Sequence, residues 1–141
     1  MSLLIAIHAA STLFMTGLIW FVQAVHYPLL AGVGQDGFED YVTGHASRTT
    51  LVVGPAMLAE LGTAIALLTM APASGPVGPY VAGLALLAVI WVTTALVQVP
   101  QHDRLQRGFD ARVHRALVSR NWIRTVAWSL RSGLVLWLMT R

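Results

Sequence analysis

Five side chains of this sequence have the chemistry to move a proton and to stabilise the charge left behind: His26, His45, His102, Asn121 and Arg124. An imidazole accepts and releases protons near neutral pH, so His26 and His102 are candidate general bases. A guanidinium and an amide hydrogen-bond to a negatively charged oxygen, so Arg124 and Asn121 are candidates for holding an oxyanion. We therefore predict that His26, His102, Asn121 and Arg124 are catalytic and remove a proton from a weakly acidic organic substrate.

Other polar and aromatic residues lie close to this set in the sequence and would form the walls of a substrate site. Tryptophan supplies flat apolar surface, whereas polar side chains orient the polar atoms of a ligand. For tryptophan and tyrosine at the ends of apolar segments, the alternative role is that of an anchor at the membrane interface. The residues predicted to contact substrate are Trp20, Gln23, Tyr27, His45, Arg48, Gln98, Trp122 and Trp128.

Composition predicts the elements that position these residues. Of the 141 residues, 56% are hydrophobic and only 11% are charged, and the mean hydropathy of +0.67 is too apolar for a soluble fold of this size. Four stretches, at 3–30, 49–70, 80–99 and 122–140, approach the ~20 apolar residues that a membrane-spanning helix requires. We predict a single domain, residues 1–141, with an all-α fold. It would be an up-down bundle of four transmembrane helices in the lipid bilayer.

The distribution of arginine predicts the topology of this bundle. The chain contains no lysine, and six of its arginines lie in or beside the first and third loops, whereas the second loop, 71–79, is uncharged. By the positive-inside rule, loops one and three are cytoplasmic and both termini lie outside. The net charge of +3 is therefore explained without a nucleic-acid partner. The third loop, 103–120, is expected to form a short amphipathic helix or a helical loop on anionic lipid.

Up-down connectivity brings one end of every segment to the same side of the bundle. The polar residues at the cytoplasmic ends would therefore converge there, and the absence of cysteine excludes thiolate ligands and disulfides. These residues are His26, His45, Arg48, Gln98, His102, Asn121 and Arg124. We expect them at the mouth of one pocket.

Two charged residues lie deep inside apolar segments and predict a buried ion pair. Glu60 lies twelve residues past Arg48, and Arg131 lies eleven past Arg120, so the two are at similar depths. Asn121, Arg124, Trp128 and Arg131 also share one helical face. Because an isolated charge in hydrocarbon is costly, we predict that Glu60 and Arg131 pair between the second and fourth segments.

Three motifs carry a resemblance to a known family. They are Val25-His26-Tyr27-Pro28, Val99-Pro100-Gln101-His102-Asp103-Arg104-Leu105, and the stretch 117–125, which includes Arg124-Thr125. In this order they resemble the anthrone-oxygenase-like small bacterial membrane proteins, which have four helices, a His-Pro near the end of the first helix and an Arg-Thr pair opening the fourth. The chain departs from the pattern by Tyr27 between His26 and Pro28, and by His102 where asparagine is usual.

The resemblance implies a membrane oxidoreductase of the bacterial inner membrane. Such a protein would let O2 attack an activated carbon acid in a hydrophobic aromatic or phenolic substrate, anthrone-like or quinol-like, and this reaction requires no cofactor. The residues would then act as assigned above, with the substrate entering from the bilayer.

Two other classes of function stay open on the sequence. His26, His45 and His102, with His114 in reserve, could ligate haem or a metal ion, although the nearby arginines disfavour a bare dication. His8 would matter more in that case, whereas otherwise we expect it to make a hydrogen-bonded contact between helices. The third class is a non-catalytic membrane subunit or small transporter. The sequence also leaves open whether the chain forms a homo-oligomer.

Overall fold

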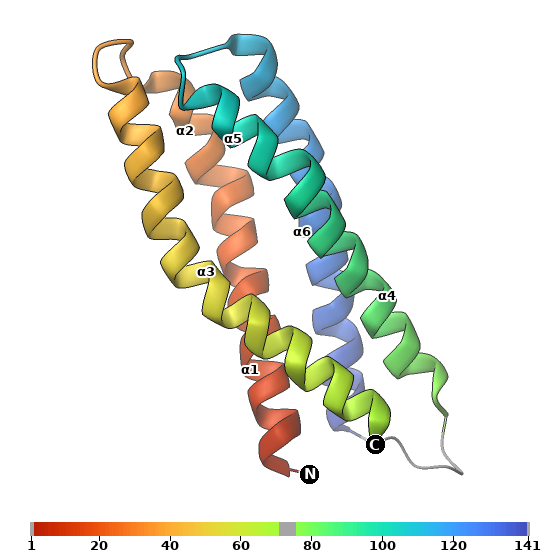
Figure 1. The fold of residues 1–141 in the computed structure, drawn as a ribbon. Coiled ribbons are helices and arrows are strands. Elements are labelled where there is room, and N and C mark those ends of the chain that lie inside the picture. The colour runs from red at the N-terminus through yellow and green to blue at the C-terminus, as the bar shows by residue number, and fades with distance from the viewer. Residues whose placement is uncertain (1, 71–75, 141) are drawn as a thin grey trace.

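The computed structural model describes residues 2–70 and 76–140, and within these ranges every element of regular structure is helical. Four long helical rods run side by side and alternate in direction along the chain (Figure 1). The all-α prediction is therefore confirmed. The first rod comprises α1 (Ser2–Phe21), a π-helix (Val22–His26), α2 (Tyr27–Leu29) and a 3-10 turn (Leu30–Gly32). The others are α3 (Phe38–Thr69); α4 (Gly78–Thr93), a π-helix (Thr94–Gln98) and α5 (Val99–Leu105); and α6 (Ala111–Met139).

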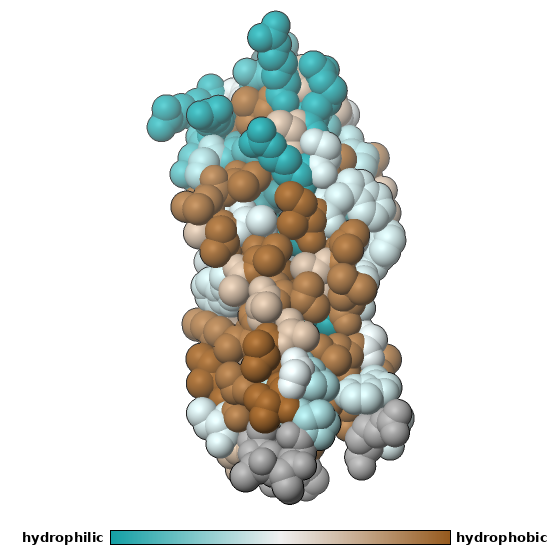
Figure 2. Space-filling view, turned by 90° about the vertical axis from the view of Figure 1, so that its right-hand side faces the viewer, coloured by the Kyte–Doolittle hydropathy of each residue, from teal (hydrophilic) through white to brown (hydrophobic). Residues whose placement is uncertain are grey.

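Three of these rods are long and apolar enough to cross a membrane. They are Leu3–Gly32, Phe38–Thr69 and Gly78–Leu105. Hydrophilic side chains gather at the upper end of the molecule, where α2, α5 and the start of α6 lie, and apolar side chains cover most of the visible face below (Figure 2). This distribution agrees with a membrane protein that has one strongly polar end.

The helices at the polar end are longer than the apolar stretches alone predict. Gly37 has a φ of 89°, which allows the sharp turn into α3, and Gly108 has a φ of 127° between α5 and α6. Asp110 then caps α6, because its carboxylate accepts from the backbone N–H groups of Arg112 and Val113. The bonds from Val113 and Arg112 hold the pKa of this exposed carboxyl below its usual range.

For the third loop, 103–120, a short amphipathic helix or a helical loop is expected, and most of this stretch is helical, but it forms no separate helix. Instead α5 continues to Leu105, a turn follows, and α6 begins at Ala111. The arginines of this stretch are therefore carried on the ends of two long helices and on the turn between them.

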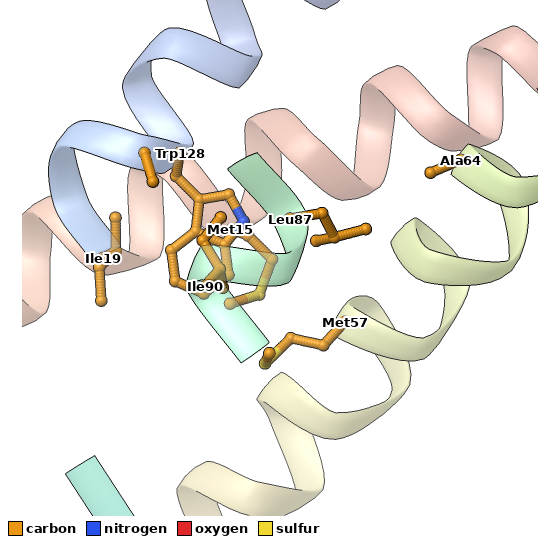
Figure 3. Close-up of a cluster of buried hydrophobic side chains, with 8 residues drawn as sticks. Met15, Ile19, Met57, Ala64, Leu87, Ile90 and Trp128 are labelled. Carbon is orange, nitrogen blue, oxygen red and sulfur yellow. The ribbon is translucent and has the colours of Figure 1, made fainter. Parts of the chain in front are cut away.

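The main apolar core lies where α1, α3, α4 and α6 meet. Trp128 of α6 is fully buried there and is surrounded by Met15, Leu87 and Ile90 (Figure 3). A second cluster at the polar end, centred on Tyr27, Phe38 and Leu105, is also buried. The two clusters hold the rods together at the main core and at the polar end, and a cavity lies beside them.

Candidate functional site

A cavity of about 740 Å³ lies between α3 and the rod formed by α4 and α5, with α1 behind it. Its walls are mainly apolar and include Met15 and Ile19 from α1, Met57 from α3 and Trp91 from α4. Ligand pockets in proteins have volumes of roughly 300–1,000 Å³ and are lined mostly by apolar side chains. The cavity therefore has the size and lining of a small-molecule site.

Polar side chains gather at one part of this cavity, and each comes from a different helical element. Tyr27 belongs to α2, His45 to α3, Gln98 to the second π-helix, His102 to α5 and Arg124 to α6. Three residues predicted from the sequence, His45, His102 and Arg124, are thus brought together on the cavity wall. Tyr27 and Gln98, predicted to contact substrate, are there as well.

The hydrogen bonds of His102 determine which of its ring nitrogens is free to act as a base. Nδ1 lies 2.8 Å from the carbonyl oxygen of Gln98, and a carbonyl can only accept, so Nδ1 carries the proton. Nε2 lies 3.3 Å from the hydroxyl of Tyr27. In the neutral form of His102, Nε2 therefore has the lone pair and accepts from this hydroxyl, which can pass on a proton.

The other two predicted imidazoles continue from His102 as a chain of rings. The His45 ring centroid lies 5.8 Å from that of His102 and 4.2 Å from that of His26. His26 also stacks on Tyr41, with centroids 6.5 Å apart. His26 does not line the cavity, whereas His102 and His45 do.

Arg124 is buried, and two of the side chains that hold it in place, Trp128 and Asn121, do not line the cavity. Its guanidinium carbon lies 5.3 Å from the centroid of the Trp128 ring, and its Nη1 donates to Oδ1 of Asn121 at 3.4 Å. Asn121 donates in turn to Oε1 of Gln23 at 3.0 Å. Asn121, Gln23 and Trp128, for which catalytic and substrate-binding roles are predicted, therefore lie behind the arginine and not on the cavity wall.

Several buried polar atoms near the cavity lack a hydrogen-bond partner among the described residues. Both amide atoms of Gln98, Nε1 of Trp91 and Nε of Arg124 are of this kind. Gln98 is only 2% exposed and Arg124 only 7%. An unsatisfied buried polar group costs roughly 1–3 kcal/mol, so such groups mark places where a ligand or water supplies the partner.

Three further residues predicted to contact substrate lie away from the cavity. Trp20 and Trp122 are exposed on the outer surface and pack edge to face, with ring centroids 5.5 Å apart. Arg48 is exposed and does not line the cavity. In their place the structure provides Trp91, which the sequence prediction missed. Its position seven residues before Gln98, on the same helical face, is the signal that could have found it.

The ion pair expected between Glu60 and Arg131 is present and fully buried. Nε of Arg131 lies 2.9 Å from Oε1 of Glu60, and Nη1 of Arg131 donates to the carbonyl of Gly83. Thr12 and Trp128 also donate to the two carboxylate oxygens, at 2.8 and 3.0 Å. The carboxylate of Glu60 on α3 thus accepts hydrogen bonds from side chains of α1 and α6, and Arg131 links this group to α4 through Gly83.

His8 is part of the same buried region and not of the cavity. Its Nδ1 lies 2.8 Å from Oγ1 of Thr63, which is a hydrogen-bonded contact between α1 and α3 of the kind expected from the sequence. Among the described residues, no three histidine, aspartate or glutamate side chains are arranged to hold a metal ion. The tri-histidine metal site considered for His26, His45 and His102 is therefore not formed, although their rings are in contact.

The geometry of the cavity is the main guide to its chemistry. The likeness to the anthrone-oxygenase-like proteins rests on the three sequence motifs alone. No family model, curated protein or solved structure matches this chain.

Proposed function

We propose that the protein is an oxidoreductase of the inner membrane that binds a hydrophobic phenolic substrate in the cavity and lets O2 oxidise it. In this proposal all four rods cross the bilayer, loops one and three are cytoplasmic, and both termini lie outside. The polar end of the cavity then lies near the cytoplasmic leaflet. The substrate is a bilayer-soluble aromatic molecule with an ionisable oxygen.

The exposed face of α6 supports its place as the fourth membrane-spanning helix. Its outward side chains are apolar and follow helical spacing, as at Trp122, Val126 and Leu130. Its two deep charges, Arg124 and Arg131, are both turned inward and buried. Charged residues of membrane helices usually face the interior in this way.

The observation that carries the proposal is the set of unpaired polar groups beside an otherwise apolar cavity. Among the described residues, neither the amide NH2 nor the amide oxygen of Gln98 has a hydrogen-bond partner, and the Nε–H donor of Arg124 has none. A phenol matches these groups, because its hydroxyl both donates and accepts and its anion attracts a guanidinium. The apolar remainder of the ring system would pack against Met15, Met57 and Trp91.

The chemistry assigned to the residues is deprotonation followed by oxidation. Nε2 of His102 takes the proton of the carbon acid, directly or through the hydroxyl of Tyr27, while Arg124 stabilises the enolate oxygen. The carbanion then reduces O2. In the net reaction an aryl CH2 group and O2 become a C=O group and H2O, so one oxygen atom enters the product and the other leaves as water.

The experiment measures O2 uptake and product absorbance with the protein in lipid nanodiscs and anthrone as substrate. We expect His102→Gln to lower the rate by roughly 10²–10⁴-fold, the usual contribution of a general base, and Arg124→Gln to lower it comparably. His8→Gln is the matched control, because His8 lies outside the cavity, and should keep its rate. An unchanged rate in a well-folded His102→Gln protein, or a wild-type protein that consumes no O2, would refute the proposal.

A further inference from the structure

The exposed residues among those that line the cavity lie on α3 and on α5, so we infer that the cavity opens between α3 and the rod of α4 and α5. Its rim includes Leu51 and Leu58 on α3, which are 74% and 61% exposed, and Val99 on α5, which is 49% exposed. These apolar side chains belong to helices that are long and apolar enough to cross a membrane. In the bilayer this opening therefore faces lipid chains.

The two parts of the cavity differ in polarity. Gln98, His102 and Arg124 lie at one part, while Met57 and Val53 on α3 lead from there towards the rim without a charged group. A ligand that matches both parts has a polar ring at one end and an apolar extension at the other. A compact ring without an extension would leave much of the 740 Å³ and the whole opening to lipid.

We propose that the substrate carries an alkyl or isoprenoid chain, which lies in the opening between α3 and α4 while its hydroxylated ring lies at Gln98 and Arg124. The ligand class is therefore a chain-bearing phenol that is resident in the membrane and has the oxidisable CH2 group in its ring system; a quinol has a similar hydroxylated ring and serves below as a binding probe. This inference rests on the proposed function, because the ring is the part to be oxidised, and adds the chain and its path.

A phospholipid is a poorer match to the same groups. Its phosphate accepts hydrogen bonds but has no donor for the free Oε1 of Gln98. Asp103 also lines the cavity and would repel a phosphate near Arg124. A phenolic hydroxyl supplies the donor and carries no fixed charge.

The alkyl or isoprenoid chain of the ligand contributes little binding affinity in a bilayer, because lipid is as apolar as the cavity wall. The test therefore blocks the opening and does not rely on chain length alone. Leu51→Phe combined with Leu58→Phe narrows the rim, and Val52→Phe is the matched control, because Val52 is 52% exposed on the same helix but does not line the cavity.

The probes are 2-methyl-1,4-naphthoquinol and the same ring carrying a four-isoprene chain, kept reduced without O2 so that no turnover occurs. Binding is measured in nanodiscs by quenching of intrinsic tryptophan fluorescence. We expect the double rim variant to weaken binding of the chain-bearing probe by about tenfold, as for overpacking of a filled site, and the ring-only probe by less than about twofold. Val52→Phe should change neither.

Gln98→Leu and Gln98→Met test the ring site. Each variant should bind both probes more weakly, and its melting temperature shows whether it is folded. If the rim variant weakens the binding of both probes equally, or of neither, the isoprenoid chain does not lie in the opening and the inference is wrong. This holds even if the Gln98 variants bind both probes more weakly, as a ring site at Gln98 requires. If neither probe binds the wild-type protein, or if both Gln98 variants bind as the wild type does, the inference and the proposed function fail together.

Discussion

At the scale of single residues, Trp128 connects the buried ion pair to the cavity. Its Nε1 donates to Oε2 of Glu60 at 3.0 Å, and its ring face lies beneath the guanidinium of Arg124. The ring is fully buried among Met15, Leu87 and Ile90, so it has little freedom to move (Figure 3). Glu60 therefore helps to orient Arg124 through one intervening side chain.

Two substitutions of Trp128 separate these contacts. Trp128→Phe keeps a ring under Arg124 but removes the N–H that donates to Oε2 of Glu60. We therefore expect the free energy of unfolding to fall by about 1–3 kcal/mol. Trp128→Leu removes the ring as well and should cost about 3–5 kcal/mol, as other large-to-small core changes do. If the ring positions Arg124, the Leu variant alone should also weaken binding of the naphthoquinol probes. Equal binding by both variants would contradict the positioning role.

The ion pair itself gives a second prediction at this scale. Glu60→Gln or Arg131→Met alone leaves one buried charge unpaired and should destabilise the protein by about 3–5 kcal/mol. The double variant removes both charges and should recover much of that loss. Thermal unfolding in nanodiscs measures the three variants. Additive losses in the double variant would show that the two charges do not depend on each other.

At the scale of elements, the two π-helices have a common arrangement. Each is followed two residues later by a proline, Pro28 after His26 and Pro100 after Gln98. Because proline has no N–H, the carbonyl four residues before it does not accept the usual α-helical hydrogen bond. The backbone there is then free to depart from the regular α-helical pattern. In both turns the bond runs from residue i to i−5, from Tyr27 to Val22 and from Val99 to Thr94. Such turns occur frequently at functional sites.

The π-helix Thr94–Gln98 can be tested by deleting single residues. A π turn accommodates one extra residue, so deletion of Ala95 should restore a regular helix while the flanking segments keep their faces. Deletion of Val89 in the regular helix α4 instead rotates every following residue of the rod by about 100° around the helix axis. We expect the Ala95 deletion to fold but to lose probe binding, because Gln98 lies in the altered turn.

The Val89 deletion is the matched control and should unfold the protein. It would move Ile90 out of the core, where this side chain is fully buried. Circular dichroism and melting temperature distinguish the two deletions. An Ala95 deletion that binds both probes as the wild type does would show that the π turn is dispensable for the site.

At the scale of the whole molecule, the arginines define one end. Arg104, Arg107, Arg112, Arg115 and Arg120 are all exposed, and this end of the surface is the hydrophilic one (Figure 2). We expect this end to be cytoplasmic, with both termini outside. Alkaline phosphatase fused after Arg141, or inserted in the loop 71–79, should be active, and a fluorescent protein at either place should be dark. The opposite pattern at the C-terminus would reverse the assigned topology.

The sequence by itself determined the helical class, the membrane-like apolar segments and the pairing of Glu60 with Arg131. Each depends on a strong term in the free energy: burial of backbone polar groups in helices, transfer of apolar side chains out of water, and the cost of an isolated charge. The helix ends were less accurate, because the cap at Asp110 and the glycine turns extend the helices well beyond the apolar stretches.

Only the tertiary structure decided which polar residues face the cavity. The outer and inner faces of these helices are both apolar, so hydropathy does not show how each helix is rotated about its axis. Packing around Trp128 and the π turn ending at Gln98 set that rotation. They place His45, His102 and Arg124 on the cavity wall, behind which Asn121 lies. Trp20 and Trp122 are left outside for the same reason, while Trp91 lies within.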